Sequence, residues 1–559
     1  MQAMESLSQS DRAAAPACAG WQFWIDRGGT FTDVIGLSPQ GELHVRKVPS
    51  APLDGAGGDP GLNAAQEVLR AAGAQGARIV AVKVGTTVAT NALLTRGGEP
   101  VLLVTTAGFA DALRIGYQNR PDIFARDIVL PQPLYAQVIE ARERVTCAGE
   151  VLVPLDLEHL REELARARSA GRRAVAIVFL HGWRHTQHEA AAARCARQLG
   201  FAEVSVSHEL SPLVRYVARG DTTVLNAYLN PPLSTYLRSL TSQLRALDPH
   251  AVLALMQSNG GLADAQHFHA LASVLSGPAG GLIGMRSAAA RLGVRRLIGF
   301  DMGGTSTDVS LIDGELPQRF EHLIAGVRLQ QPMLDVHTIA AGGGSLLALR
   351  DGRLAVGPES AGADPGPTCY GRGGPLTLTD VQVLLGRLRT DTLPRVFAAD
   401  GRSPIDPRAV SAGFAALEGR VAAEGSASLS PEALAAAFLE VGVESMANAI
   451  RQVSTRQGLD AADFTLFCFG GAAPQHACRV ARAAGVRRIL VHPLASVLSA
   501  FGIGVADRLA VRRASLRLAL DEAGLRAART ALATLSGEAE AELTPHASSG
   551  AAVRVSTFL

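Results

Sequence analysis

The chain has 559 residues, of which 47% are hydrophobic and 19% are charged, and its formal net charge is +2. This balance, without a long basic run, argues against a nucleic-acid partner and against a membrane-surface role. No apolar run approaches the roughly 18 residues that cross a bilayer. The 6 cysteines form no C-x-x-C pair, so we expect neither a zinc site nor a disulfide framework, and we expect a cytoplasmic protein.

The chain begins with polar and alanine-rich residues at 1–20, which predict a disordered leader without a signal peptide. Hydrophobic periodicity then predicts helices and strands in alternation. Helices are expected at 59–72, 158–169, 187–199, 377–388 and 431–457, and strands at 79–84, 174–180, 204–207 and 252–257. Alternating helices and strands after residue 150 are typical of a parallel sheet.

The strongest motif is DRGGTFTD at Asp26 to Asp33, which returns as DMGGTSTD at Asp301 to Asp308. Both copies obey the pattern D-x-G-G-T-x-T-D, and each lies between two short apolar runs. Such runs broken by a glycine turn predict two strands joined in a hairpin. Each copy therefore predicts a strand, a glycine turn and a second strand.

The composition of these turns favours phosphate. Paired glycines let backbone N–H groups approach an anion, and nearby hydroxyls add donors. The predicted phosphate-loop residues are Arg27, Gly28, Gly29, Thr30 and Thr32 in the first copy, and Gly303, Gly304, Thr305, Ser306 and Thr307 in the second. Asp26 and Asp301 are hard oxygen ligands that suit Mg²⁺. The simpler alternative is a pair of tight hairpins whose Asp and Thr satisfy the turn backbone, and the duplication argues against it.

Two duplicated hairpin loops resemble those of the actin, sugar-kinase and Hsp70-like heat-shock ATPases. The resemblance implies an α/β fold of two duplicated nucleotide-binding lobes, with mixed sheets flanked by helices. No Walker phosphate loop is present in the chain. In this superfamily a Gly-Gly turn after the second loop seats the adenosine, which assigns that role to Gly470 and Gly471.

Three further stretches carry candidate site residues. Asn119 and Arg120 lie before a proline in GYQNRPDIF, and this arginine is suited to clamp a substrate carboxylate unless the loop is merely solvated. Asp335 and His337 share one face of a predicted strand, where they form either a catalytic acid–base pair or a structural pair. Gly343 and Gly344 follow that strand and predict a backbone-lined surface beside a phosphate or a ribose.

Longer stretches of the chain resemble the hydantoinase A / 5-oxoprolinase family, most closely the N-terminal part of ATP-dependent 5-oxoprolinases. They include IDRGGTFTDV, KVGTTVATNALL, VLSGPAGG, IGFDMGGTSTDVS, AAGGGS, VGPESAGADPGP and CFGGAAPQHAC, in the family's order. The resemblance implies ATP-driven hydrolysis of the lactam 5-oxo-L-proline to L-glutamate, with Mg²⁺ held by Asp26 and Asp301. The residue that polarises the lactam stays open among Asp335, His337 and Asp380.

The resemblance also implies an organisation in lobes. A first lobe, of the hydantoinase A N-terminal type, is expected at 21–215, and a hydantoinase/oxoprolinase lobe at 216–515. The stretch 516–559 is expected to open a β-rich C-terminal region. The family further implies a second-half, hydantoinase B-type partner and a homo- or hetero-oligomer. Two alternatives remain: a hydantoinase A or ketone carboxylase ATPase subunit acting on another carbonyl, and a non-catalytic nucleotide-gated module.

Overall fold

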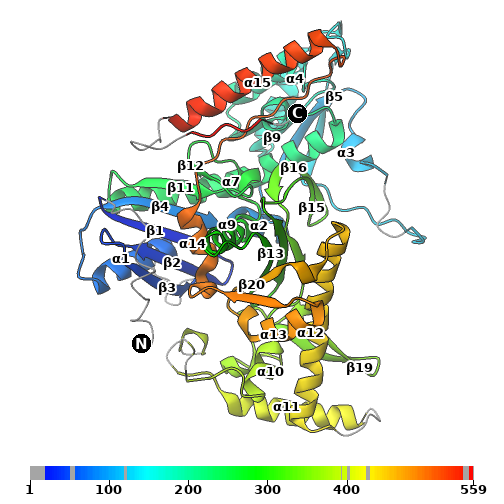
Figure 1. The fold of residues 1–559 in the computed structure, drawn as a ribbon. Helices are drawn as coiled ribbons and strands as arrows, with labels where there is room; N and C mark the ends of the chain where they lie inside the picture. Colours follow the sequence, from blue (N-terminus) through cyan, green and yellow to red (C-terminus); the bar gives the residue numbers. More distant parts are fainter. Residues whose placement is uncertain are drawn as a thin grey trace.

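The structure, a computed structural model, describes residues 19–50, 57–118, 123–391, 393, 395–398, 403–423, 429–544 and 553–557. Most of the expected disordered leader lies outside these residues, and so do Asn119 and Arg120. The protein has two α/β halves that lie next to each other (Figure 1). A third sheet and a C-terminal helix lie at the end of the first half that points away from the second half.

The first half is built on a sheet of six strands in the order β12-β11-β4-β1-β2-β3. Strand β1 pairs antiparallel with β2 and parallel with β4, and β11 continues the parallel side. The strands are β1 Trp21–Arg27, β2 Phe31–Leu37, β3 Leu43–Pro49, β4 Ile79–Thr86, β11 Val252–Met256 and β12 Leu262–Asp264. Helix α1 (Pro60–Ala71) covers part of this sheet, and the Asp59 carboxylate caps its start.

The second half repeats this topology in a sheet of five strands, in the order β17-β14-β13-β20-β21. Its strands are β13 Arg296–Met302, β14 Thr307–Asp313, β17 His337–Ile339, β20 Thr465–Phe469 and β21 Arg488–Val491. Here β13 pairs antiparallel with β14 and parallel with β20, as β1 does with β2 and β4. The predicted duplicated α/β fold with mixed sheets is confirmed.

The first sheet takes strands from both sides of residue 215, where the boundary between the lobes is expected. The long helix α7 (Tyr216–Leu247) leads back to β11 and β12, which complete the first sheet. The first half therefore extends past residue 264. In the stretch 516–559, where the start of a β-rich region is expected, the described residues contain the helix α15 (Glu522–Leu543).

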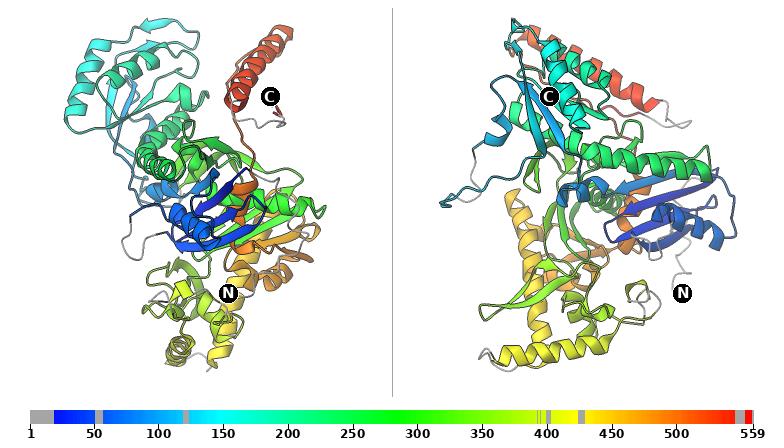
Figure 2. Two further views of the ribbon diagram at one scale, coloured as in Figure 1. Left: turned by 90° about the vertical axis from the view of Figure 1, so that its left-hand side faces the viewer. Right: turned by 180° about the vertical axis from the view of Figure 1, so that it is seen from behind.

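A third sheet branches from the first half with all its strands parallel, in the order β10-β9-β5-β6. The strands are β5 Val101–Thr106, β6 Tyr135–Ala141, β9 Ala174–Val178 and β10 Glu203–Val206. Helices α4 (Leu157–Ser169) and α5 (Gln187–Gln198) pack against it, which confirms the parallel α/β prediction for this part. Figure 2 shows this unit standing to one side of the two halves.

Two short helices rich in glycine join the halves. Helices α9 (Ser276–Ala290) and α14 (Leu498–Val505) lie between the two large sheets and share one hydrophobic core with strands of both (Figure 1). A methyl group at Gly502 would lie 1.8 Å from the carbonyl oxygen of Gly280, so the two backbones are in direct contact. The glycines of the LSGPAGG segment thus allow α9 to pack closely against α14.

Helix α12 (Pro431–Arg456) is the one described helix that is long and apolar enough to cross a membrane. The expectation that no stretch approaches this length is therefore wrong for α12. However, 56% of its most apolar window is buried inside the protein. Its residues Leu434, Phe438 and Met446 belong to the core of the second half, as expected of a core helix.

A buried ion pair stabilises the third sheet. The Glu189 carboxylate accepts hydrogen bonds from the Phe179 N–H at 2.8 Å and the Ser207 hydroxyl at 2.6 Å, and it pairs with His208 and Arg219. Burial favours the neutral acid, but the His208 hydrogen bond and the Arg219 charge prevail and hold the Glu189 pKa below its usual value.

We predict that Glu189→Ala lowers the free energy of unfolding by about 3–5 kcal/mol, because it leaves the Arg219 charge buried without its partner. Urea unfolding measures the change. Glu163→Ala, which breaks only a surface pair with Arg166, is the control and should cost less than about 1 kcal/mol. Since the Glu189 pKa is lowered, its contribution is present above the unfolded pKa and is lost as the pH falls. Equal effects of the two substitutions would contradict this account.

Candidate active site

The two hairpins each place two carboxylates on one face of their sheet. Asp26 on β1 lies directly opposite Asp33 on β2, and Asp301 on β13 lies directly opposite Asp308 on β14. Residues opposite each other in an antiparallel pair share a face. Asp33 and Asp308 were not among the predicted site residues, although the last position of the repeated motif could have identified them.

We call these four carboxylates the carboxylate cluster, and the pKa values of two of them, Asp26 and Asp301, are raised by neighbouring acids of the cluster. Burial, and then the charge of Asp33, raise the pKa of Asp26 to about 7. The pKa of Asp301 is raised well above its usual value by burial, by Asp308 and by Asp26 from the other half. The cluster is therefore one electrostatic unit built from both hairpins.

The cluster has one nearby cation, Lys47 on β3, which forms an ion pair with Asp33. The positive charge of Lys47 opposes the rise in pKa at Asp26, Asp33 and Asp301. Within the described residues, Asp26 Oδ1 is buried and has no hydrogen-bond partner. Among the described residues no three or more of these acids come together as a metal-ligand set, so Mg²⁺ at this unsatisfied oxygen would be held mostly through water, as Mg²⁺ commonly is.

The glycine turns of both hairpins are alike and open to solvent. The Gly28 N–H donates to the Phe31 carbonyl at 3.0 Å, and the Gly303 N–H donates to the Ser306 carbonyl at 3.0 Å. Gly29 and Gly304 are exposed, and a methyl group at Gly304 would meet no protein atom within 4 Å. This space leaves room for an anion to approach the turn backbone.

The hydroxyl groups of the motif divide into two sets. Thr32 and Thr307 are buried, where Thr32 bonds to the Ser50 hydroxyl and Thr307 donates to the Ala341 carbonyl. They hold the hairpins in shape instead of facing a ligand. Thr30, Thr305 and Ser306 lie in the turns and are at least partly exposed.

Residues 342–344, three glycines, support the glycine turn of the second hairpin through backbone hydrogen bonds. The Gly343 N–H donates to the Gly303 carbonyl at 3.0 Å, and the Gly344 N–H donates to the Gly304 carbonyl at 2.6 Å. A methyl group at Gly342 would lie 2.6 Å from the Gly304 carbonyl oxygen. Gly343 and Gly344 are buried and these N–H groups are engaged, so the two residues position the turn. The sequence predicted instead a backbone-lined surface beside a phosphate or a ribose.

A glycine also approaches each first-strand aspartate from the neighbouring parallel strand. Gly470 has a φ of 85°, and a methyl group there would lie 2.3 Å from Asp301 Oδ1. Gly471 beside it is exposed. In the first half, Gly85 on β4 is paired with Asp26 itself, and a methyl group there would lie 2.6 Å from Ile503 and 3.4 Å from Asp26 Oδ1. Both sheets thus leave space at the carboxyl end of their central strands.

The start of helix α9 also faces the cluster. A methyl group at Gly277 would lie 3.5 Å from Asp26 Oδ1, and Ser276 exchanges hydrogen bonds with the backbone of Thr86. Helix N-termini attract negative charge through their free N–H groups.

Arg27, Asp335 and His337 lie away from the cluster. Arg27 pairs with Asp59 at 3.2 Å, on the opposite face of β1 from Asp26. Asp335 lies 3.9 Å from Arg319 in an exposed ion pair. His337 is opposite Val309, so its ring lies on the other face of the sheet from Asp308. No contact of these three side chains supports the role predicted for it.

Asp380 has a structural role. Its carboxylate accepts the backbone N–H groups of Thr368, Cys369 and Thr377, at 3.1, 2.8 and 2.8 Å. These bonds tie the Gly- and Pro-rich loop to the start of α10 (Leu378–Leu384), so the carboxylate is fully occupied.

The described ends of the GYQNRPDIF segment lie on the surface. The Arg328 guanidinium stacks over the Tyr117 ring at 5.1 Å, and Ile123 and Phe124 are exposed. Asn119 and Arg120 themselves are outside the described residues, so their substrate role stays a prediction.

The raised pKa values predict how pH affects Mg²⁺ binding. Between about pH 4 and 7 the folded protein holds protons on Asp26 that the unfolded chain releases, so stability without metal falls as the pH rises through this range. We expect Mg²⁺ to raise the melting temperature clearly at pH 8 and very little at pH 5.5, because a proton and a cation compete for the same oxygens. Thermal melts with NaCl of equal ionic strength are the control. An equal Mg²⁺ effect at both pH values would contradict the cluster as the metal site.

Comparison with known proteins places this geometry in a family. Residues 22–200 match the hydantoinase/oxoprolinase N-terminal region, and residues 219–512 match the hydantoinase/oxoprolinase family. 5-Oxoprolinase 1 of Arabidopsis thaliana is 40% identical over 87% of this chain, and this chain spans 41% of that protein. The acetophenone carboxylase gamma subunit of Aromatoleum aromaticum is 32% identical over 89% of this chain, which spans 70% of the subunit.

A solved structure agrees with this assignment. The ATP-dependent caprolactamase of Pseudomonas jessenii superimposes with a TM-score of 0.80 at 31% identity, covering 94% of this chain and 76% of the other. The two family matches divide the chain between residues 200 and 219, near the boundary expected from the sequence, although the first sheet continues to β12. The repeated hairpins, the matched regions and the shared fold lead to one conclusion: the chain belongs to the hydantoinase/oxoprolinase family.

Proposed function

We propose that this chain is the ATP-binding, carbonyl-phosphorylating part of a cyclic amide hydrolase that opens 5-oxo-L-proline to L-glutamate. The observation that carries the proposal is the carboxylate cluster, to which two duplicated glycine turns from separate halves each contribute a pair of acids. Similarity to a 5-oxoprolinase and to an ATP-dependent caprolactamase supports the type of reaction.

The chemistry begins with a stable bond. Resonance makes the lactam amide a poor electrophile, so water attacks it slowly. In the proposed step the lactam oxygen attacks the γ-phosphorus of ATP, an O–P bond forms, and ADP leaves. Water then adds to the activated carbon, and the C–N bond breaks with a proton passing to nitrogen, which leaves an acyl phosphate. A second water attacks the carbonyl carbon of this acyl phosphate, and inorganic phosphate leaves with the former carbonyl oxygen.

The residues present fit these tasks. The N–H groups of Gly28 and Gly303 close the turns, and those of Gly29 and Gly304 would hold the phosphates, helped by Thr30 and Thr305. Asp26 and Asp301 would hold Mg²⁺, with Asp33 and Asp308 beside them, and the metal when bound would offset the phosphate charge. Gly470 and Gly471 border Asp301, where they would leave room for the nucleotide.

Completion of the hydrolysis is assigned to a partner. The chain spans about two fifths of the 5-oxoprolinase that it resembles, and one related protein is itself named as a subunit. We propose a hydantoinase B-type partner, as a second chain or a second half, within a homo- or hetero-oligomer in the cytoplasm. Arg120 remains the proposed clamp for the substrate carboxylate.

ADP release by the purified chain tests the substrate, with 5-oxo-L-proline, ε-caprolactam and acetophenone compared and glutamate assayed in parallel. We expect 5-oxo-L-proline to stimulate ADP release most strongly. Stimulation without glutamate would agree with a missing partner, and stimulation with equal glutamate would remove the need for one. Stronger stimulation by caprolactam or acetophenone would reassign the substrate and keep the ATP site.

A further inference from the structure

A second cavity with the features of a ligand site lies in the third sheet, away from the hairpins. It has a volume of about 370 Å³, within the range of small-molecule sites. Leu180, His181 and Trp183, which directly follow β9, line one side of it. Ligands of parallel sheets bind at the carboxyl ends of the strands, and this cavity lies at such an end.

The lining of this cavity is cationic. Arg184, Arg219 and Arg517 contribute to it, and no acidic side chain does. Among the described residues, neither Arg184 nor Arg517 has an ion-pair partner. The two exposed positive charges of Arg184 and Arg517 create a local preference for an anion, whereas the Arg219 charge is paired with Glu189.

Arg219 supplies an unsatisfied donor at this wall. It is completely buried, and its terminal nitrogens are engaged by Glu189, Ser207 and the Phe179 carbonyl. Its Nε has no hydrogen-bond partner among the described residues. A buried donor without a partner is costly, so Arg219 leaves an unsatisfied polar group next to the cavity.

The start of helix α7 adds to the positive potential. Val214, Tyr216 and Arg219 line the cavity and belong to the first turn of this helix or directly precede it. First-turn N–H groups lack acceptors within a helix and favour anions. Tyr216 brings a neutral hydroxyl, because burial raises its pKa to about 12.

The remaining walls are apolar or aromatic. Leu180, Val214, Trp183 and the ring of Tyr216 offer flat, weakly polar surfaces beside the three arginines. Arginine forms paired hydrogen bonds to a carboxylate, and aromatic walls accept a flat body by stacking. We propose that this cavity is a second ligand site, which binds a small organic carboxylate with a flat or apolar body. The site is independent of the proposed ATP chemistry.

Tryptophan fluorescence provides the test. The chain has 3 tryptophans, and Trp183 is the one that lines the cavity, whereas Trp21 and Trp24 are buried in the first sheet. The full chain is titrated with benzoate, a flat carboxylate, and with benzamide, a neutral molecule of the same shape. We expect a saturable emission change with benzoate and binding at least about tenfold weaker with benzamide, since charge-assisted hydrogen bonds are lost.

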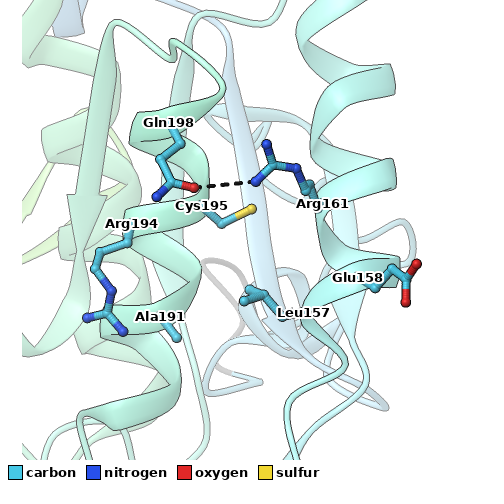
Figure 3. A pocket seen from close by; sticks show the side chains of 7 residues that line it. All are labelled: Leu157, Glu158, Arg161, Ala191, Arg194, Cys195 and Gln198. Carbon is cyan, nitrogen blue, oxygen red and sulfur yellow. Dashed lines mark hydrogen bonds between the residues drawn. The ribbon is translucent and has the colours of Figure 1, made fainter.

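Two variants locate the binding. Arg517→Gln should weaken benzoate binding about tenfold. Arg194→Gln, which changes an exposed arginine in another cavity between α4 and α5, should leave it unchanged (Figure 3). Trp183→Phe should abolish the emission change. The proposal is overturned if benzoate gives no saturable change, if benzamide binds equally well, if Arg517→Gln titrates as the wild type, or if the signal survives Trp183→Phe.

Discussion

Asp301→Asn should lower oxoproline-stimulated ADP release by at least about a hundredfold, because it removes one acid of the carboxylate cluster. The amide has the shape of the carboxylate but carries no charge, so it is a weaker ligand for a cation. Asp301 is partly exposed, and its pKa is raised by desolvation and by three other acids. The substitution therefore relieves repulsion, and the melting temperature without metal should stay the same or rise.

The control for this variant is Asp313→Asn, on the same hairpin. Asp313 is exposed at the end of β14, where it pairs with Arg296 at 3.1 Å, far along the strand from the turn. The Asp313→Asn variant should retain full oxoproline-stimulated ADP release. If Asp301→Asn kept wild-type turnover, or lost activity only together with its fold, the cluster would not be the site of ATP chemistry.

Gly502→Ala should lower the free energy of unfolding by about 3 kcal/mol, because a methyl group at this position overlaps the Gly280 carbonyl oxygen at 1.8 Å. The contact joins α14 to α9 between the two sheets, so the helices must move apart. We also expect weaker nucleotide binding, since α9 begins beside Asp26. Urea unfolding and nucleotide titration measure the two effects.

Gly419→Ala is the matched control. Gly419 is also a glycine inside a helix, α11 (Pro407–Ala423), but a methyl group there would meet nothing within 4 Å. Alanine favours helices by up to about 1 kcal/mol over glycine, so this variant should be slightly more stable than the wild type. Equal behaviour of the two alanine variants would show that the α9–α14 contact does not hold the halves together.

Repetition in the sequence was the reason why the fold could be predicted. The two motif copies lie in hairpins of the same topology, and the helix boundaries at 59–72, 158–169 and 431–457 are correct within about two residues. Local signals explain this success: Asp59 caps α1, and Pro431 begins α12 after the capping Ser430.

Pairings between distant segments could not be predicted. The return of β11 to the first sheet depends on a partner more than 150 residues earlier, and no local pattern encodes that contact. The same limit explains why the acid–base role predicted for His337, on one strand with Asp335, is not supported by the structure. Its strand pairs so that the ring faces away from the acids, and only the register decides this.

The site itself was predicted in part. The sequence identified the glycine turns and the first aspartate of each motif, whose placement beside each other is consistent with the proposed role. Asp33, Asp308 and Lys47 were missed, because their importance depends on cross-strand pairing and on burial. The sequence predicted Gly343 and Gly344 as ligand contacts, whereas their N–H groups support the glycine turn of the second hairpin.

The most direct test of the central claim is a calorimetric titration of the chain with a non-hydrolysable ATP analogue, with and without Mg²⁺. One site made from both hairpins predicts one nucleotide per chain, binding that depends on Mg²⁺, and loss of that dependence in both Asp26→Asn and Asp301→Asn. If the nucleotide bound equally well without Mg²⁺, or if only one of the two substitutions mattered, the two halves would not share a single metal–nucleotide site.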